Sequence, residues 1–174
     1  MIGFRSFSFD DVPLVHQWFN MPHVQEFYSL RAWSIEDVRK KFMEEKTIWK
    51  WIVDNDARPI GYIQHYRVSD FPWKDGESVV HFQEDVEKNA AGLDFFLGDP
   101  ESMGMGSRIL IQFLEKHIWP EFHYCIVDPD VRNVRSIKMF EKCGFVKAKR
   151  IATVDALGCK VQLELMMAEM NILS

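Results

Sequence analysis

Two glycines, Gly104 and Gly106, stand between an apolar run and a stretch with helical spacing. The run Leu93–Leu97, closed by Gly98, predicts a strand, and a helix with one apolar face follows the glycines: Ile109, Leu110, Phe113, Leu114 and Ile118. A helix N-terminus offers free N–H groups and a positive dipole end, which suit a phosphate, and glycine lets that ligand come close. A tight turn without a ligand is the alternative, since neither G-x-G-x-x-G nor a P-loop is present.

A second strand–turn–helix unit follows. Tyr124–Val127 predicts a short apolar strand, and Asp128-Pro129 turns the chain after it. Asn133–Cys143 has the spacing of a helix, which Gly144 ends. Two strands separated by a helix imply a mixed sheet flanked by helices, an α/β architecture.

These two units resemble the GCN5-related N-acetyltransferases (GNAT). The resemblance rests on Gly104-x-Gly106 and on Asp128-Pro129 with Asn133-x-x-Ser136-Ile137-x-x-Phe140-Glu141-Lys142-x-Gly144-Phe145. Within that family the chain is most similar to the aminoglycoside 6'-N-acetyltransferases, on three segments: Ile60-Gly61-Tyr62-Ile63-Gln64, Gly92-Leu93-Asp94 and Asp128-Pro129. The resemblance implies one domain over residues 1–174, with a mixed sheet of about seven strands and about four flanking helices.

The resemblance also implies that acetyl-CoA is the cofactor. In that family the pantetheine arm lies in a gap between two parallel strands, here Leu93–Leu97 and Tyr124–Val127. The implied cofactor-binding residues are Phe96 and Leu97 on the strand, Met103, Gly104, Met105, Gly106 and Ser107 around the pyrophosphate, and Asn133 and Ser136 on the next helix. The family usually carries Gln or Arg where this chain has Glu101, so we expect this carboxylate to turn outward.

Acetyl transfer requires a neutral amine, and Asp94 is the candidate that would provide it. An amine with a pKa of about 8–10 is mostly protonated at neutral pH, so a carboxylate that accepts its proton is useful. Asp94 lies inside an apolar strand, where a carboxylate is costly unless it has a partner or a role. The resemblance matches it to the proposed base of the aminoglycoside enzymes. An outward-facing strand residue on a solvated edge is the alternative.

The implied substrate is a cationic small molecule with a primary amine. Gln64 and Asp128 match substrate-contacting positions of the aminoglycoside enzymes, and Asp155 in a late loop could reach the substrate. Asp128 could instead cap the turn before Pro129. The stretch Asp70–Lys88 is rich in acidic residues and holds Phe71, Trp73 and Phe82; it predicts either a solvated loop or an acidic wall for a cation.

Phe140 departs from the family pattern, because many members carry Tyr at that position. The tyrosine phenol is thought to protonate the leaving thiolate, and Phe has no proton to donate. A thiol with a pKa of roughly 8.5 is not very basic, so water could take over this step. We therefore expect the departure to affect the rate more than cofactor binding.

Composition narrows the class of protein. The 174 residues are 47% hydrophobic and 14% aromatic, which suits one globular domain with a sizeable core. There is no apolar run of about 18 residues and no secretory signal, so no membrane association is expected. Three cysteines without C-x-x-C fit a reducing cytosol, and the histidines lack metal-ligand spacing. The net charge of −5 argues against nucleic acid and agrees with a polycationic ligand.

The remaining elements follow from shorter patterns. The first helix starts at Asp10-Asp11, Met21-Pro22 ends it, and 24–33 is expected to be irregular. Ser34-x-x-Asp37 resembles a capping box that opens a helix to Glu45. The expected further strands are 2–9, 49–53, 59–68, 146–154 and 159–169, and 70–88 is expected to be the least regular part.

Three functions remain open at this point. The first is an aminoglycoside 6'-N-acetyltransferase, or a relative that acts on another polyamine-like molecule. The second is an acyltransferase of the siderophore or lysine type, whose segment after Asp128-Pro129 looks much the same. The third is a non-catalytic module that binds or senses acetyl-CoA. A monomer and a homodimer are both compatible with the sequence, and a cytoplasmic location is expected.

Overall fold

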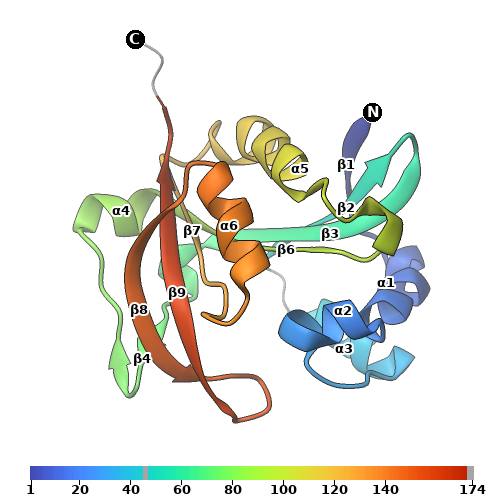
Figure 1. Ribbon diagram of the computed structural model, residues 1–174, viewed down its shortest axis with the longest axis horizontal. Coiled ribbons are helices and arrows are strands. Elements are labelled where there is room, and N and C mark those ends of the chain that lie inside the picture. Colours follow the sequence, from blue (N-terminus) through green and yellow to red (C-terminus); the bar gives the residue numbers. More distant parts are fainter. Residues whose placement is uncertain (45–46, 172–174) are drawn as a thin grey trace. The chain divides into compact units, whose positions relative to one another are not determined.

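The computed structural model describes residues 1–44 and 47–171 (Figure 1). Its strands are β1 (Ile2–Ser6), β2 (Trp49–Asn55), β3 (Arg58–Arg67), β4 (Lys74–Asp75), β5 (Ser78–Val79), β6 (Ala90–Leu97), β7 (Tyr124–Val127), β8 (Val146–Val154) and β9 (Lys160–Glu169). Within the described residues seven of them form one sheet, in the order β1-β2-β3-β6-β7-β9-β8, and β4 pairs with β5 separately. β6 and β7 pair in parallel, whereas β1–β2, β2–β3, β7–β9 and β8–β9 pair antiparallel. The expected mixed sheet is therefore confirmed.

The helices of the described residues are short. They are α1 (Val12–Phe19), α2 (Pro22–Val24), α3 (Ile35–Glu44), α4 (Glu84–Asn89), α5 (Gly106–Phe113) and α6 (Val134–Lys142), with the π-helical segments η2 (Gln25–Ser29) and η5 (Leu114–Ile118). Three 3-10 turns complete the set: η1 (Phe9–Asp11), η3 (Val68–Asp70) and η4 (Pro100–Ser102). None of the helices in residues 1–44 and 47–171 is long and apolar enough to cross a bilayer.

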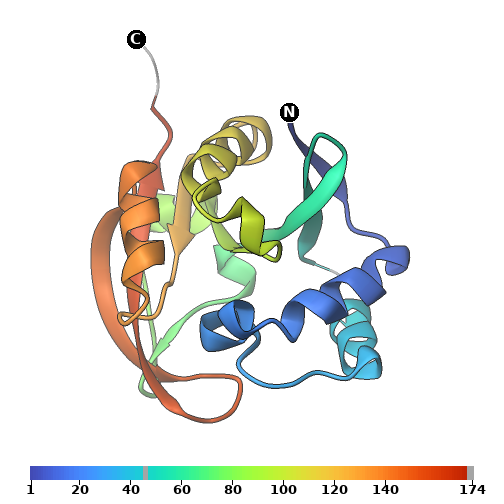
Figure 2. The same ribbon diagram turned by 45° about the vertical axis from the view of Figure 1, so that its right-hand side comes forward.

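The chain forms two compact units, and each has its own packing. The first comprises residues 1–65 and 94–104, and it includes α1, α2 and α3, the blue helices of Figure 2. Its core is aromatic: Trp18, Phe19, Phe42, Tyr62 and Phe96 are all buried in one cluster. The Phe42 and Tyr62 rings lie 5.5 Å apart, and those of Phe19 and Phe96 5.9 Å apart. The side chains of β3 and β6 on this face are thereby fixed by the helices.

The second unit comprises residues 66–93 and Met105 with the residues that follow it. It contains the β8–β9 hairpin, and the segment that includes β4 lies beside β8 (Figure 1). The Gly76 N–H donates to the Ala152 carbonyl over 2.7 Å, and the Ala152 N–H donates to Asp75 Oδ1 over 3.0 Å. The stretch 70–88, expected to be the least regular part, holds only the short elements β4, β5 and α4 after η3, and contacts with β8 order the part around Asp75.

The prediction that 24–33 is irregular is wrong. A new helix starts at Pro22, which fits a first helical position because it needs no N–H partner there, and η2 continues it to Ser29. Leu30, with φ of 67°, ends it. The Tyr28 ring lies 4.5 Å from that of Phe96, so packing stabilises a segment whose local sequence predicts no helix.

Other expectations for the first unit need only small corrections. β1 ends at Ser6 rather than at Phe9, since Phe9 opens the 3-10 turn η1. The capping box is confirmed: the Asp37 N–H donates to Ser34 Oγ over 3.1 Å, and the Ser34 N–H donates to Asp37 Oδ2 over 3.4 Å. The expected helix end at Glu45 lies outside the described residues.

Candidate active site

The end of β6 is held tightly against β3 in the first unit. A Cβ atom on Gly61 would lie 2.7 Å from the Phe96 carbonyl oxygen, so only glycine allows this approach. Beyond the strand, the N–H groups of Gly98 and Asp99 both donate to the Ile60 carbonyl, over 2.9 and 3.1 Å. These contacts fix the backbone of β6 from Phe96 to its end, just beyond Asp94.

Asp94 is half-buried and has a hydrogen-bond partner in the same unit. Gln64 Nε2 donates to Asp94 Oδ2 over 2.7 Å, and Gln64 Oε1 accepts from the Tyr62 hydroxyl over 2.9 Å. Tyr62 is fully buried, and Gln64 is 7% exposed. Two residues that the sequence assigns to the substrate, Gln64 and Asp94, thus lie together. Asp94 differs from a fully solvated edge residue.

Phe96 and Leu97 follow Asp94 on β6, and their contacts differ. The Phe96 ring belongs to the buried aromatic core, so only its main chain is available to a ligand. The Leu97 carbonyl accepts a hydrogen bond from His23 Nε2 over 2.9 Å. This contact ties the start of the α2–η2 segment to the end of β6, a link that no pattern in the sequence indicates.

The turn after β6 suits an anion. Gly104 has φ of 99°, which favours glycine, and no atom lies within 4 Å of the place where its Cβ would be. Met105 precedes α5 without a side-chain cap, and the first turn of α5 carries no acidic residue. The first N–H groups of a helix have no acceptor within that helix. Those of Gly106 and Ser107 are therefore suited to bind a ligand.

The Glu101 side chain points into solvent, as expected for a residue that would contribute only its backbone to cofactor binding. Its side chain is 80% exposed and lies 3.2 Å from the Arg58 guanidinium. Arg58 also pairs with Asp99, and Asp99 Oδ1 accepts from the Glu101 N–H over 3.1 Å. Arg58 thus balances the negative charge of this turn, a function that the sequence analysis missed.

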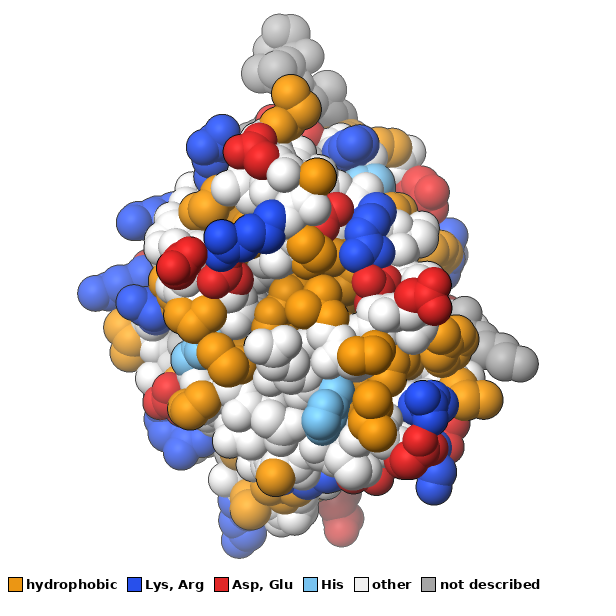
Figure 3. Space-filling model, turned by 90° about the vertical axis from the view of Figure 1, so that its right-hand side faces the viewer, with side chains coloured by type: hydrophobic (Ala, Val, Ile, Leu, Met, Phe, Trp, Pro, Cys, Tyr) orange, Lys and Arg blue, Asp and Glu red, His pale blue; other side chains and the backbone are white. Residues whose placement is uncertain are grey.

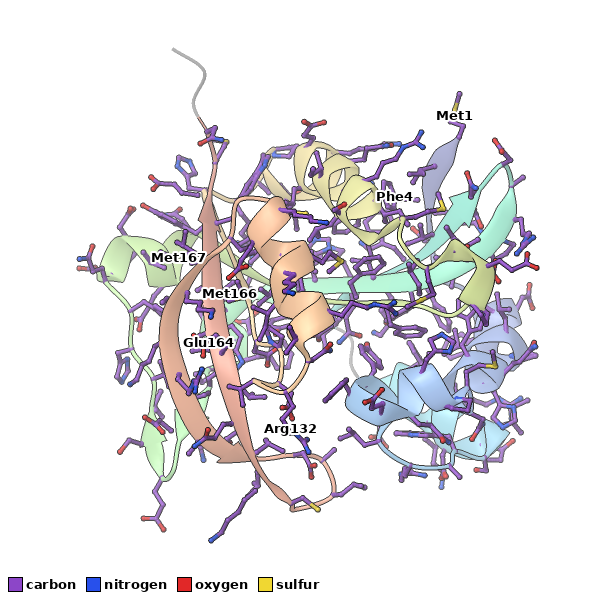
Figure 4. All side chains as sticks on the ribbon, viewed as in Figure 1. Met1, Phe4, Arg132, Glu164, Met166 and Met167 are labelled. Carbon is purple, nitrogen blue, oxygen red and sulfur yellow. The ribbon has the colours of Figure 1, made fainter. Side chains whose placement is uncertain are left out.

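Asp128 lies in the second unit, where it accepts a hydrogen bond from Trp73 Nε1 over 2.9 Å. The loop that carries it is fixed along β9, because the Glu164 N–H donates to the Pro129 carbonyl over 2.8 Å. Figure 4 labels Glu164 on β9 and Arg132 in the loop before α6; Arg132 pairs with Asp130 over 2.8 Å. Asp128 therefore stands on a well-supported loop.

Asn133, Ser136 and Asp155 have structural roles in the same unit. Asn133 caps α6, since its Oδ1 accepts from the Ser136 N–H over 3.3 Å. Asp155 Oδ1 accepts from the N–H groups of Leu157 and Cys159, over 2.8 and 2.9 Å, in the turn between β8 and β9. These bonds account for Asn133 and Asp155 without a ligand, whereas Ser136 contributes only its backbone N–H.

The acidic residues of 70–88 largely bind groups close to them. Glu87 accepts from the Phe82 N–H over 2.9 Å, and this bond holds the pKa of Glu87 below its usual value. Asp85 accepts from the Tyr124 hydroxyl over 2.8 Å. Figure 3 shows another face, the right-hand side of Figure 1, on which acidic and basic side chains are interspersed. Among the described residues, no group of three or more His, Cys, Asp or Glu side chains could hold a metal ion.

Phe140 is buried on α6 and packs edge-on against Phe145, with ring centroids 5.4 Å apart. Its aromatic ring therefore belongs to the core. Neither ring carries a proton that could reach a leaving thiolate.

Cys143 lies beside the turn that opens α5, and its Sγ donates to the Ser107 carbonyl over 3.6 Å. Burial raises the pKa of this thiol to about 11, so at pH 8 roughly one molecule in a thousand carries the reactive thiolate. We expect N-ethylmaleimide to modify the exposed Cys159 at least tenfold faster in the native protein. Peptide mass spectrometry after timed quenching measures both rates. Equal rates would contradict the half-buried position and raised pKa of Cys143.

Three residues at these sites have hydrogen-bonding roles that the sequence analysis did not assign: Tyr62, Trp73 and Arg58. Tyr62 stands two positions before Gln64 on an alternating strand, so the period of two could have indicated that both face the same side. Trp73 and Arg58 bind partners 55 and 41 residues away, Asp128 and Asp99, and no local pattern reports such contacts.

Known acetyltransferases resemble this chain in sequence and in fold. The model of the acetyltransferase (GNAT) domain matches residues 9–153. An aminoglycoside N(6')-acetyltransferase type 1 of Klebsiella pneumoniae is 23% identical over 165 residues, which cover 88% of this chain and 78% of the relative. The enzyme AAC(6')-Ib, solved with paromomycin and acetyl-CoA, has a TM-score of 0.75 at 22% identity, over 97% of this chain and 93% of its own. A spermidine N-acetyltransferase of Vibrio cholerae, solved with CoA and spermine, has a TM-score of 0.71 at 14% identity, over 97% and 95%.

The family resemblance read from the sequence is thereby confirmed, together with the fold and the cofactor. The matched region includes β6, the Gly104 turn and α6, which hold most of the residues described above. The chain belongs to the GNAT family and is an acetyl-CoA-dependent N-acetyltransferase.

Proposed function

We propose that this acetyltransferase acts on a primary amine of a cationic small molecule, most specifically the 6'-amine of an aminoglycoside. The observation that carries the proposal is the half-buried Asp94 carboxylate, which Gln64 holds by a 2.7 Å hydrogen bond at the end of β6. A carboxylate in that position can bind an ammonium group and accept its proton. The curated relatives that share this region are named aminoglycoside N(6')-acetyltransferases, which supports the finer assignment.

The proposal assigns the cofactor to main-chain groups. The pyrophosphate binds the amides of Met103, Gly104, Met105, Gly106 and Ser107, and the pantetheine arm pairs with backbone at Phe96 and Leu97. The family resemblance assigns Asn133 and Ser136 to the same arm. Support comes from the open space at Gly104 and from the uncapped start of α5, where partial positive charge favours phosphate.

The chemical step requires one base and no acidic side chain. Asp94 takes a proton from the bound ammonium, and the neutral nitrogen then attacks the thioester carbonyl carbon. The carbon–sulfur bond breaks and the thiolate of CoA leaves, and the nitrogen gives its second proton to solvent to yield the neutral amide. Solvent protonates that thiolate, since Phe140 has no proton to give. A backbone N–H on the strand polarises the thioester oxygen.

Asp128 and Asp155 supply further negative charge for a polycation in this proposal. The hydrogen bond from Trp73 fixes the Asp128 carboxylate, so binding an ammonium there costs little ordering of that side chain. Glu84, Asp85 and Glu87 of the 70–88 stretch bind donors close to them in sequence and add general charge only.

A panel of amines tests the proposal, with acetyl-CoA as donor and thiol release as the readout. Kanamycin represents the aminoglycosides, spermidine the polyamines, and lysine and hydroxylysine the siderophore type. We expect the highest kcat/KM for kanamycin. A preference for spermidine would keep the cationic acceptor but overturn the aminoglycoside assignment. Binding of acetyl-CoA without turnover of any amine would favour the sensor alternative.

The proposal also predicts a salt dependence. Exposed charge pairs are screened over about 8–10 Å at ionic strengths near 0.1–0.15 M. We therefore expect the KM for kanamycin to rise several-fold when about 0.5 M NaCl is added, because the Debye length shortens toward 3–4 Å. KCl should raise the KM for kanamycin as much as NaCl does, because screening depends on ionic strength and not on the identity of the salt. A constant KM would favour a neutral acceptor.

A further inference from the structure

We propose that Tyr62 is a positioning residue that acts on Asp94 through Gln64; the inference rests on the proposed function. The three side chains form one hydrogen-bonded chain in the first unit, Tyr62 hydroxyl to Gln64 Oε1 (2.9 Å) and Gln64 Nε2 to Asp94 Oδ2 (2.7 Å). Nothing in the sequence patterns assigns a function to Tyr62, which stands in β3 between the apolar residues Gly61 and Ile63.

The direction of this chain follows from the chemistry of its groups. An ionised carboxylate only accepts hydrogen bonds, so the amide nitrogen of Gln64 must face Asp94. The amide oxygen then points the other way and requires a donor, which the Tyr62 hydroxyl provides. With Asp94 ionised, as a base must be, the hydrogen-bonded chain has one consistent orientation.

The ring of Tyr62 makes a rigid anchor. It is fully buried, and its centroid lies 5.5 Å from that of Phe42, 5.6 Å from that of Phe96 and 6.5 Å from that of Phe7. Two of these contacts are edge-to-face at 89–90°, which restricts rotation of the ring. The hydroxyl therefore occupies a fixed place at the border of the aromatic core.

Gln64 transmits this fixed position to Asp94. A glutamine side chain has three rotatable bonds and loses considerable freedom when it is ordered. Bonds at both polar ends hold it in one rotamer before any substrate arrives. Asp94 consequently keeps one orientation, and preorganisation of this kind increases the rate rather than the affinity for the cofactor. In this account Gln64 and Tyr62 position the base, and Gln64 is not required to bind the substrate directly.

Three variants test the inference by steady-state kinetics with the best amine of the panel. Tyr62→Phe removes the hydroxyl alone, Gln64→Met removes both polar ends at similar length, and the double variant combines them. We expect Tyr62→Phe to lower kcat about 3- to 10-fold with an unchanged KM for acetyl-CoA. The double variant should match Gln64→Met, since the hydroxyl acts only through the amide.

Ser29→Ala is the matched control. The Ser29 hydroxyl is buried in the same unit and donates to the Phe19 carbonyl over 2.6 Å, so its removal also deletes a buried hydrogen bond beside the aromatic core. We expect a lower melting temperature and an unchanged kcat. An equal loss of kcat in Ser29→Ala, a parental kcat in Tyr62→Phe, or factors that multiply in the double variant would each overturn the inference.

A spectroscopic measurement tests the positioning role of Tyr62 independently of turnover. The side-chain amide protons of Gln64 are identified in a ¹H–¹⁵N correlation spectrum by their absence in Gln64→Met. We expect slow exchange with solvent in the parent and fast exchange in both Tyr62→Phe and Asp94→Ala, which removes the acceptor of the Gln64 amide. Unchanged exchange in Tyr62→Phe would overturn the positioning role even if no amine were acetylated. Absence of turnover with the expected exchange would instead count against the proposed function alone.

Discussion

Replacing Asp94 by Asn should lower kcat for amine acetylation by roughly 10²–10⁴, the usual range for loss of a general base. The substitution keeps the volume and one oxygen that can accept from Gln64 Nε2, so the local packing should persist. It removes the charge and the basicity. The loss should shrink at high pH, because free amine is then abundant without a base. Steady-state kinetics from neutral to alkaline pH measures the effect.

Asp54→Asn is a suitable control for this variant. Asp54 is another partly buried carboxylate of the first unit, on β2, where burial raises its pKa despite the nearby Arg5. The control should retain the parental kcat. If Asp94→Asn raised the KM for the amine while kcat held, Asp94 would only anchor the ammonium. If neither parameter moved by more than a few-fold, Asp94 would not belong to the site.

The Gly104→Ala variant should raise the KM for acetyl-CoA about tenfold and leave the KM for the amine unchanged, since a methyl group there obstructs phosphate approach to the turn. The protein itself offers no clash, because no atom lies within 4 Å of the added Cβ. The backbone strain at a φ of 99° costs about 1–2 kcal/mol. Titration of acetyl-CoA in initial-rate assays provides the KM.

Gly144→Ala separates strain from cofactor binding. Gly144 has φ of 92° and also has no atom within 4 Å of an added Cβ, so the same cost of strain applies. It ends α6 and contributes to none of the proposed ligand contacts. We expect similar destabilisation of both variants and a raised KM for acetyl-CoA only in Gly104→Ala. Equal KM values would remove the turn from the cofactor site.

Much of the fold could be predicted from the sequence where the pattern is local. The apolar run at Leu93–Leu97, the helical spacing after Gly106 and the capping box at Ser34 all correspond to observed elements. The π-helical segment η2 could not be predicted, because the packing of Tyr28 on Phe96 stabilises it across the chain. The ordering of 70–88 likewise depends on contacts with β8, far along the sequence.

The candidate site, too, could be predicted only in part from the sequence. Asp94 stands out in the sequence because a carboxylate is costly within an apolar strand. The groups that satisfy it do not stand out: Gln64 reads as a polar strand residue and Tyr62 as a core aromatic. Only the neighbouring positions of β3 and β6 in the sheet turn these residue types into a hydrogen-bonded chain.

The position of the transferred acetyl group tests the central claim most directly. Neomycin and paromomycin carry an amine and a hydroxyl, respectively, at C6', and are otherwise the same molecule. Each is incubated with acetyl-CoA and the enzyme, and the products are analysed by mass spectrometry and NMR. The account predicts one acetyl group on the 6'-nitrogen of neomycin and no acetylation of paromomycin. Acetylation of both at another amine, or of neither, would contradict it.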